Sequence, residues 1–406
     1  MRSVGGAERS TKWLSGVAVF TIAMVPFVGY LGHLGFAPLL AVTGLLCLPG
    51  LARPRPSSPP MIALFVLVLW ALLSLAWSPA APNLADLKDS SDMEDFTALK
   101  LLFELAFYGS AVAALGQLSD RSKIRVGTVM VVCALALALL TALDGVSGEA
   151  FYKWLRVMIH DPIRADFAIV KVSMPTYVLA LLFWPVARIM SSRGWRPAIV
   201  VLFVATLVAA VSTSADASWA ALASASLVWL GVRFVGKPAA RILVAVVAAP
   251  FVLGPILLVW GLRSGFVAWL HEHVPNSWDA RLNIWAFTAN QVQAHAIRGW
   301  GIDASRSFGP AIPLHTHNAA MQLWLELGAI GAALAGVFFS WVAYRIVGMT
   351  GEVREDGAMA AGALVTYVVI GGLSFGVWQE WWLALGALTV IACGVARGLK
   401  SPPRRR

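Results

Sequence analysis

Charged side chains are scarce in this chain of 406 residues. Asp, Glu, Lys and Arg make up 13% of it, about half of the roughly 25% that is usual for soluble globular proteins. Hydrophobic residues make up 59%, and the mean hydropathy is +0.75. So few charges could not cover the surface of a soluble protein of this length, which excludes a soluble enzyme and a disordered chain. The composition is that of a polytopic membrane protein.

Cysteine is rare as well. Cys47, Cys133 and Cys393 each lie in an apolar run, and the sequence contains no CxxC pair. This excludes a scaffold built on disulfides. We interpret the three residues as small buried side chains rather than as metal or redox groups.

Long apolar runs recur along the whole chain. A membrane-spanning helix needs about 20 mostly apolar residues. Twelve segments fit this requirement: 13–32, 34–51, 60–78, 97–117, 125–143, 168–188, 197–213, 217–233, 241–261, 318–344, 358–376 and 379–396. We therefore predict an all-α polytopic membrane protein with about twelve transmembrane helices, in which residues 1–406 form a single integral membrane domain.

Basic residues are distributed unevenly over the connections between these segments. With the N-terminus in the cytoplasm, 21 of the 31 Lys and Arg residues fall on the cytoplasmic side, together with only five of the 21 Asp and Glu residues. The positive-inside rule therefore predicts that both termini are cytoplasmic. The net charge of +10 is then a topology signal, so we expect membrane lipids and no nucleic acid among the partners.

Three longer connections are predicted on the opposite, outer side. The segment 79–96 is acidic, and 144–167 carries charges of both signs. The longest connection, 262–317, contains four Trp and four Arg residues, and its stretch 280–297 is predicted to form a helix on the outer face. A loop of this length in a compact protein is usually functional.

The densest group of chemically active side chains is His315-Thr316-His317-Asn318, just before the tenth apolar segment. Asn318 is a good N-cap for the helix that follows. His317 would then lie at the positive end of the helix dipole, which favours an anionic ligand. The alternative is that both histidines are interfacial or capping residues.

The order of motifs around this group resembles that of the O-antigen ligase family of bacterial inner membranes, part of the O-antigen ligase and polymerase superfamily. The family signature is His-Asn, nine residues and Gly-x-x-Gly, and it is complete here as HNAAMQLWLELGAIG, from His317 to Gly331. The upstream segments Arg281-Leu282-Asn283-Ile284-Trp285 and Gly299-Trp300-Gly301 are also similar to the family. The strong resemblance covers about residues 278–335.

The resemblance implies a reaction and a place for it. The fold would be a GT-C-like glycosyltransferase architecture in the inner membrane, with the active site in the periplasmic loop 262–317. The enzyme would move an O-antigen glycan from undecaprenyl diphosphate to a sugar hydroxyl of lipid A–core, without a metal or another cofactor. A polymerase or protein O-oligosaccharyltransferase of the same superfamily stays open as an alternative. A flippase for the same carrier lipid is a third hypothesis.

Two residues carry the expected chemistry. His317, at the motif position, is predicted to act as the general base or to orient the acceptor, because a neutral imidazole near pH 7 suits that task. Arg281 matches an arginine of the family and is assigned to the donor diphosphate, which a guanidinium can bind through two hydrogen bonds. The alternative for Arg281 is an ion pair with Asp279 or with a neighbouring loop.

Further cations are expected at the diphosphate. Lys171 lies where the family often has Arg, and its alternative role is snorkelling to the interface. The family often has a Ser-Arg element before its eighth span, whereas residues 212–218 read STSADAS here, without a base. We therefore predict that Arg164 or Arg156 supplies the missing charge.

His315, Asn318 and Glu326 are predicted to support the site. An acid inside the membrane is costly unless it has a partner, so Glu326 should pair with a basic site residue or hydrogen-bond across helices.

Three further expectations concern packing. Lys100 and Glu104 are predicted to neutralise each other at i, i+4 spacing. Gly328 and Gly331 should allow helices to approach closely. Three tryptophans are interpreted as an interfacial belt, with a role in a lipid-facing cavity as the alternative: Trp378, Trp381 and Trp382.

Overall fold

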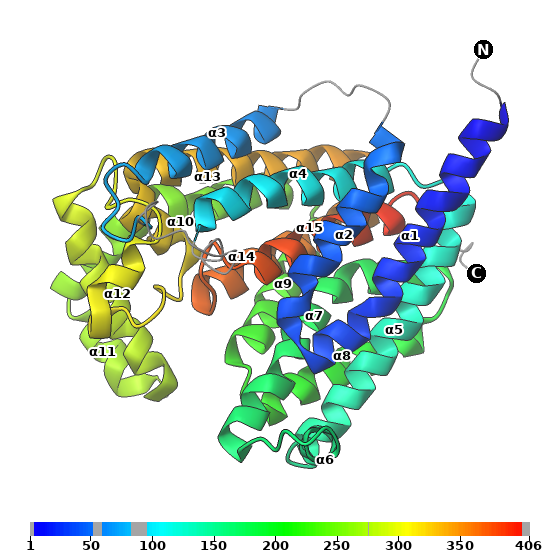
Figure 1. Cartoon of the computed structure of the whole chain (residues 1–406), viewed down its shortest axis with the longest axis horizontal. Helices are drawn as coiled ribbons and strands as arrows, with labels where there is room; N and C mark the ends of the chain where they lie inside the picture. The colour runs from blue at the N-terminus through cyan, green and yellow to red at the C-terminus, as the bar shows by residue number, and fades with distance from the viewer. Residues whose placement is uncertain (1–3, 52–58, 83–95, 275, 400–406) are drawn as a thin grey trace.

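The computed structural model describes residues 4–51, 59–82, 96–274 and 276–399, and within these ranges it contains helices and no β-strand (Figure 1). The helices are α1 (Val4–Leu31), α2 (Phe36–Cys47), α3 (Pro59–Ser74), α4 (Thr97–Leu115), α5 (Asp120–Val146), α6 (Ala150–Met158), α7 (Ala165–Ser192), α8 (Arg196–Ser212), α9 (Asp216–Phe234), α10 (Lys237–Arg263), α11 (Phe266–His273), α12 (Asn276–Ala294), α13 (Ala319–Glu352), α14 (Arg354–Leu373) and α15 (Glu380–Ala396). Short 3-10 helices are η1 (His33–Gly35), η2 (Leu48–Leu51) and η5 (Ala304–Ala311). The predicted all-α fold is confirmed.

Twelve apolar helices in the described ranges fall on the twelve predicted segments. Eight of them are long and apolar enough to cross a membrane: α1, α4, α5, α7, α9, α10, α13 and α14. The other four, α2, α3, α8 and α15, are apolar but shorter. The protein is therefore a multi-pass membrane protein. The acidic stretch 83–95 and the basic residues at 53, 55 and 400–406 lie outside the described residues.

The helices form one bundle with two distinct ends. α3, α4 and α13 run side by side across the upper part of the molecule, α13 also packs along α10, and α14 packs along α9 (Figure 1). The first turns of α1 and the last turns of α15 lie at the right of the view, whereas α11 and α12 lie at its left (Figure 1). We call the end that contains α12, residues 299–318 and residues 374–380 the outer end. The end where α7 and α15 finish and α14 begins is the inner end.

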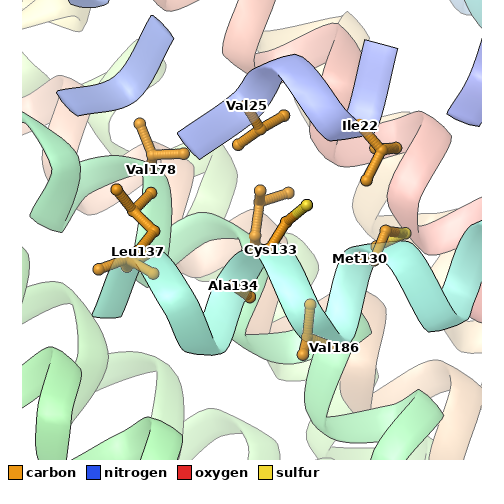
Figure 2. Close-up of a pocket in the computed structure, with 10 residues that line it drawn as sticks. Ile22, Val25, Met130, Cys133, Ala134, Leu137, Val178 and Val186 are labelled. Atoms are coloured by element: carbon orange, nitrogen blue, oxygen red, sulfur yellow. The ribbon is translucent and has the colours of Figure 1, made fainter. Parts of the chain in front are cut away.

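Apolar side chains fill the contact between α1, α5 and α7. Figure 2 shows Ile22 and Val25 of α1 facing Cys133 and Leu137 of α5, with Val178 of α7 beside them. The gap between them has a volume of about 10 Å³, which is room for about one water molecule. This contact is a packing seam rather than a ligand site. The three cysteines are free thiols in apolar surroundings, as predicted.

α13 is broken at Gly328, which has φ 65° and ψ −163°. This is a backbone conformation that L side chains rarely adopt. A β-carbon at this position would also lie 2.3 Å from the carbonyl oxygen of Ile297. The predicted span 318–344 is confirmed within α13, and the break divides it in two. Residues Ala319–Leu327 form a half-helix at the outer end.

The chain that precedes α13 fills this break with hydrogen bonds. The backbone nitrogens of Trp300 and Gly301 donate to the carbonyl oxygens of Leu325 and Glu326, at 2.9 and 2.7 Å. Gly299 and Gly301 have positive φ, and a β-carbon on Gly299 would lie 2.3 Å from the oxygen of Glu326. The Gly-Trp-Gly and Gly-x-x-Gly motifs thus contact each other through their backbones. Gly328 lets the loop that contains Gly-Trp-Gly approach α13, whereas we had expected it to let two helices approach each other.

The long connection has a small apolar core of its own. Ile284 and Val292 of α12 pack with Ile312 and with Leu325 of α13. The predicted helix 280–297 is confirmed as α12, which begins four residues earlier and ends three residues earlier. α12 is therefore held against the half-helix of α13, and this fixes the side chains that it carries.

Candidate active site

His317 is held in a strained turn at the start of α13. Its φ is 53°, in the left-handed region that non-glycine residues rarely adopt and that often marks functional sites. Its backbone nitrogen donates to Nδ1 of His315 at 3.1 Å. The next residue, Asn318, caps α13, because its side-chain oxygen accepts a hydrogen bond from the Met321 nitrogen at 3.0 Å. The predicted N-cap is confirmed, and it places His317 directly before the positive end of the helix.

A carbonyl group sets the tautomer of His317. Nδ1 lies 2.9 Å from the carbonyl oxygen of Ser374, in the connection between α14 and α15. Since a carbonyl oxygen can only accept, Nδ1 carries the proton and Nε2 carries the lone pair. Nε2 has no hydrogen-bond partner among the described residues. Burial lowers the pKa of His317 and the positive charge of Arg281 adds to this, while the hydrogen bond to Ser374 opposes it. The ring is therefore neutral at pH 7, with its basic nitrogen available.

The ring of His315 holds this turn through a hydrogen bond. Its Nδ1 accepts from the His317 backbone, so its Nε2 must carry the proton. Nε2 lies 3.1 Å from the side-chain amide of Gln379, and the amide oxygen has no partner in the present orientation. Rotating the amide by 180° lets the oxygen accept from Nε2, so we assign the amide in that orientation. Burial lowers the pKa of His315 to about 3, helped by the charges of His317, Arg306 and Arg281. His315 is a positioning residue for His317.

Arg281 brings a positive charge to the two histidines. Its guanidinium lies over the ring of Trp278, 5.4 Å from the ring centroid, and Trp278 donates to Asp216 of α9 at 3.2 Å. The alternative ion pair with Asp279 is wrong, because Asp279 instead contacts His271 and Asn283. Arg281 has no acidic partner among the described residues.

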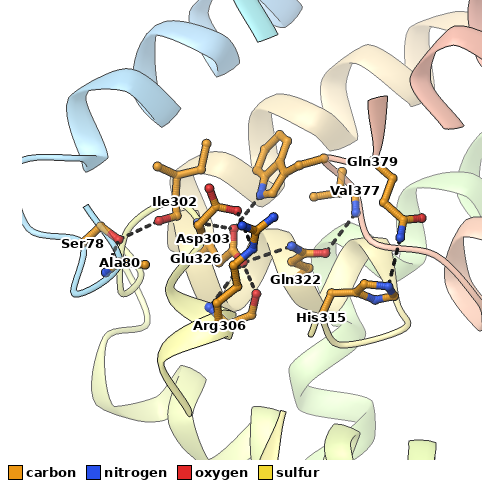
Figure 3. A network of polar contacts seen from close by, with 12 residues as sticks. Ser78, Ala80, Ile302, Asp303, Arg306, His315, Gln322, Glu326, Val377 and Gln379 are labelled. Atoms are coloured by element: carbon orange, nitrogen blue, oxygen red, sulfur yellow. Dashed lines mark hydrogen bonds and ion pairs between the residues drawn. The ribbon is translucent and has the colours of Figure 1, made fainter. Parts of the chain in front are cut away.

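Glu326 organises the outer end from inside the protein. Its carboxylate is fully buried and accepts hydrogen bonds from three separate segments (Figure 3). The donors are the Asp303 nitrogen at 3.0 Å, the Ser305 nitrogen and hydroxyl at 3.4 and 2.6 Å, the Gln322 amide at 3.0 Å and the Trp378 indole at 2.5 Å. Of the two roles expected for Glu326, hydrogen bonding across segments is the one observed. Glu326 ties η5 and the α14–α15 connection to the half-helix that follows His317.

Comparison with known proteins agrees with this site. Residues 199–336 match the family model described as O-Antigen ligase, a range that contains Arg281, His317 and the complete His-Asn to Gly-x-x-Gly motif. Residues 199–336 are therefore similar to the O-antigen ligase family.

Curated relatives carry a related name. A protein of Rickettsia felis called "Putative polysaccharide ligase" is 23% identical over 56% of this chain and 59% of its own length. A protein of Rickettsia bellii with the same name is 26% identical over 54% of this chain and 57% of its own length. The chain thus matches just under three fifths of the length of these relatives.

The remaining cations that the family resemblance suggested lie in α6 and at the start of α7. Lys171 is exposed in the second turn of α7, without an ion pair among the described residues. Arg164 directly precedes α7 and forms two hydrogen bonds to Asp166, at 3.1 and 2.8 Å. Arg156, near the end of α6, pairs with Asp161. The structure brings together His315, His317 and Arg281, and it leaves Arg156 and Arg164 in local ion pairs, so their role at a diphosphate stays a prediction.

Two of the packing expectations are wrong. Lys100 does not pair with Glu104, because its Nζ lies 2.5 Å from Glu380 of α15. The three tryptophans do not form an interfacial belt: Trp381 and Trp382 are buried, and Trp378 donates to Glu326. The reason is the same in both cases. The α14–α15 connection folds back into the outer end and meets α4 and α13 there.

Several residues of the site gave no signal in the sequence. Ser374 acts through its backbone carbonyl, which every residue has. Gln379 lies 64 residues along the chain from His315, the histidine that it contacts, in a segment without a motif. Only the His-x-His spacing indicated that a second ring would support the first.

Proposed function

We propose that this protein is an O-antigen ligase that transfers a glycan from undecaprenyl diphosphate to a sugar hydroxyl of lipid A–core. The transfer takes place at the periplasmic face of the bacterial inner membrane, where the outer end of the bundle lies. One observation carries the proposal: Nε2 of His317 is held as a free lone pair beside Arg281, a cation without an acidic partner among the described residues.

The chemistry follows from these two groups. His317 Nε2 takes the proton of the acceptor hydroxyl as the hydroxyl oxygen attacks the anomeric carbon of the donor sugar. The bond between that carbon and the diphosphate oxygen breaks, and undecaprenyl diphosphate leaves. Arg281 stabilises the negative charge of the leaving group, which a planar guanidinium can bind through two hydrogen bonds. Lys171, Arg164 and Arg156 are proposed as further contacts to the diphosphate.

This route needs no metal ion and no nucleotide. The diphosphate is already a good leaving group, so the enzyme has to hold and neutralise it rather than activate it. A polymerase or a protein O-oligosaccharyltransferase would use the same donor and the same base, and would differ in the acceptor. A flippase is less well supported, because the unpaired cation and the free imidazole gather at one end of the bundle rather than along a path through it.

A reconstituted transfer assay tests the proposal. Purified protein, lipid-linked glycan and lipid A–core are incubated with a chelator of divalent cations. We expect glycosylated lipid A–core and free undecaprenyl diphosphate. Lengthening of the lipid-linked glycan without transfer would identify a polymerase instead. Activity that is lost with the chelator and restored by a divalent cation would contradict the metal-free mechanism.

Cysteine labelling tests the orientation. In a background without the native cysteines, Ser307→Cys in η5 reports on the outer end. Glu352→Cys, at the end of α13, is the matched control at the inner end, because Glu352 is well exposed there. An impermeant thiol reagent added from the periplasm should label position 307 and spare position 352. The reverse pattern would overturn the proposed site of reaction.

A further inference from the structure

A second polar cavity adjoins the histidine pair. It has a volume of about 320 Å³ and lies at the outer end between α2, α4, η5, α13 and the α14–α15 connection. Its lining includes Lys100, Glu104, Arg306, His315, Trp378 and Glu380. A volume near 300 Å³ is at the lower end of the range found for small-molecule sites. His315 is shared with the site described above, because its ring centroid lies 4.2 Å from that of His317.

Glu104 lines this cavity with an unused carboxylate oxygen. Its side chain is 9% exposed, and Oε2 has no hydrogen-bond partner among the described residues. The neighbouring cation, Lys100, is already engaged by Glu380 at 2.5 Å. Burying a carboxylate without donors costs free energy, and buried polar groups almost always have partners. A ligand that brings hydrogen-bond donors would complete the site.

The charges in the cavity do not favour an anion. Its lining combines three acids, Glu104, Glu380 and Asp303, with two bases, Lys100 and Arg306. Arg306 lies 3.7 Å from Asp303, which shields its charge. A diphosphate entering here would meet carboxylates, whereas at Arg281 it meets an unpaired cation.

The walls suit a ring that carries hydroxyl groups on its rim and C–H groups on its faces. Two indoles line the cavity, and one of them, Trp378, is fixed by its hydrogen bond to Glu326. Indole faces pack against C–H groups, and the amides of Gln322 and Gln379 and the carboxylate of Glu104 can pair with hydroxyls. The polar walls are preorganised: Gln322 donates to Glu326, its amide oxygen accepts from the Val377 nitrogen at 3.0 Å, and Gln379 is bound to His315 (Figure 3).

We propose that this cavity is a sugar-binding subsite, in which Glu104 accepts hydrogen bonds from the hydroxyl groups of one pyranose ring. The inference rests on the proposed function, because it makes the ring part of the glycan that meets the base at His317. The ring belongs to either the acceptor or the donor, since both must converge on that histidine. The chemistry of recognition is the same in the two cases.

Calorimetric titration of the purified chain tests the subsite without catalysis. The probes are the core oligosaccharide freed of its lipid and the O-antigen glycan freed of its carrier, each titrated without the other substrate. We expect one of them to bind, and the one that binds identifies the source of the ring. Glu104→Gln should weaken that binding by about two- to tenfold, as expected for a lost hydrogen bond. Glu352→Gln, the same change at an exposed position of the inner end, should leave it unchanged.

Thermal unfolding separates this role from a structural one. Because Oε2 of Glu104 has no partner to lose, Glu104→Gln should leave Tm unchanged or raise it. Leu34→Trp, at the wall of the cavity, is a second variant that should block sugar binding by filling the space. Sugar binding unaffected by both variants, or displaced by inorganic pyrophosphate, would overturn the proposal, as would binding of neither glycan.

The outcomes distinguish this inference from the proposed function. Sugar binding that depends on Glu104 in a protein that transfers no glycan would sustain the subsite and remove the ligase assignment. Transfer that proceeds while Glu104→Gln binds the oligosaccharide as the unaltered protein does would sustain the ligase and remove the subsite.

Discussion

α7 and α14 each contribute residues to both ends of the bundle. The two ends differ in whether particular charged side chains have a partner of opposite charge. At the inner end, Arg188 of α7 and Asp356 of α14 are buried and joined by a hydrogen bond of 2.8 Å. Asp356 also accepts from the Gly398 nitrogen, and Arg188 donates to the Leu399 carbonyl, so the pair holds the end of α15 as well. Each charge there faces an opposite charge and a backbone group.

The outer end combines paired charges, such as Lys100 with Glu380, with groups that have no partner. Arg281 and Lys171 have no acidic partner among the described residues. Nε2 of His317 has no hydrogen-bond partner among them. Arg188 and Asp356 are thus paired inside the protein, whereas two groups of the outer end are positioned by neutral partners: a tryptophan ring for Arg281 and a carbonyl for His317. The difference supports the proposal that the outer end receives an anion and a proton, and it leads to five predictions.

The largest effect on transfer is expected from His317→Ala. Loss of a general base typically lowers a rate by about 10²–10⁴-fold. The half-buried ring contributes little to the core, so the variant should remain folded. His273→Ala, which removes an exposed histidine of α11, is the control and should transfer normally. The measurement is initial transfer rate at matched membrane abundance, and a near-normal rate for His317→Ala would remove the base from the mechanism.

Arg188→Met should affect stability rather than chemistry. It leaves Asp356 buried without its partner, and breaking such a pair costs about 3–5 kcal/mol. We expect a clearly lower Tm, with an unchanged transfer rate per folded molecule. Arg397→Met is the control, because its exposed pair with Glu352 is worth about 0–1 kcal/mol. If the folded Arg188→Met protein were inactive, the contrast between the two ends would be wrong.

Arg281→Lys keeps the charge and loses the second hydrogen bond to the diphosphate. A hydrogen bond to a charged group is worth about 1.5–3 kcal/mol, so the rate of transfer should fall about 10- to 100-fold. Arg298→Lys changes an exposed arginine that lies over Trp77 in the same connection, and should have little effect. Equal rates for the two variants would show that the Arg281 guanidinium does not bind the diphosphate through two hydrogen bonds.

The pH dependence of transfer should reflect the lowered pKa of His317. The base works only when neutral, so activity is lost as pH falls through that pKa. A histidine of ordinary pKa, about 6.5, would lose half of the activity at that pH, whereas this one should retain most of it there and fail at lower pH. Because the charge of Arg281 contributes to the shift, Arg281→Gln should move the acidic limb of the kcat/KM profile upward. Arg281→Lys, which keeps the charge, should leave that limb in place.

The smallest change is expected from Lys171→Arg. The substitution keeps the charge at the outer end of α7 and introduces the residue that the family often has there. Transfer should be unchanged or modestly faster in the same assay. Loss of transfer in a folded Lys171→Arg protein would show that the position is packed around lysine and does not contact the diphosphate.

The sequence by itself determined the features that depend on the solvent and on short spacing. Twelve apolar segments were readable because a lipid environment demands long apolar helices, and they match the apolar helices of the structure. Asn318 was recognisable as an N-cap because capping is a local bond, and the helix at 280–297 because it lacks helix breakers. His317 and Arg281 were found because each lies inside a motif of fixed spacing.

Only the tertiary structure decided which groups pair and which stay open. The tautomer of His317 depends on a carbonyl 57 residues away, and a backbone carbonyl leaves no trace in the sequence. Lys100 could reach Glu104 by helical spacing, but the fold brings Glu380 closer. Oε2 of Glu104 therefore has no hydrogen-bond partner in the part of the chain that the structure describes. The break at Gly328 likewise arises from the backbone of residues 296–301. Pairing between distant segments is set by how the helices pack, and this is why the open charges of the outer end emerge only once the chain is folded.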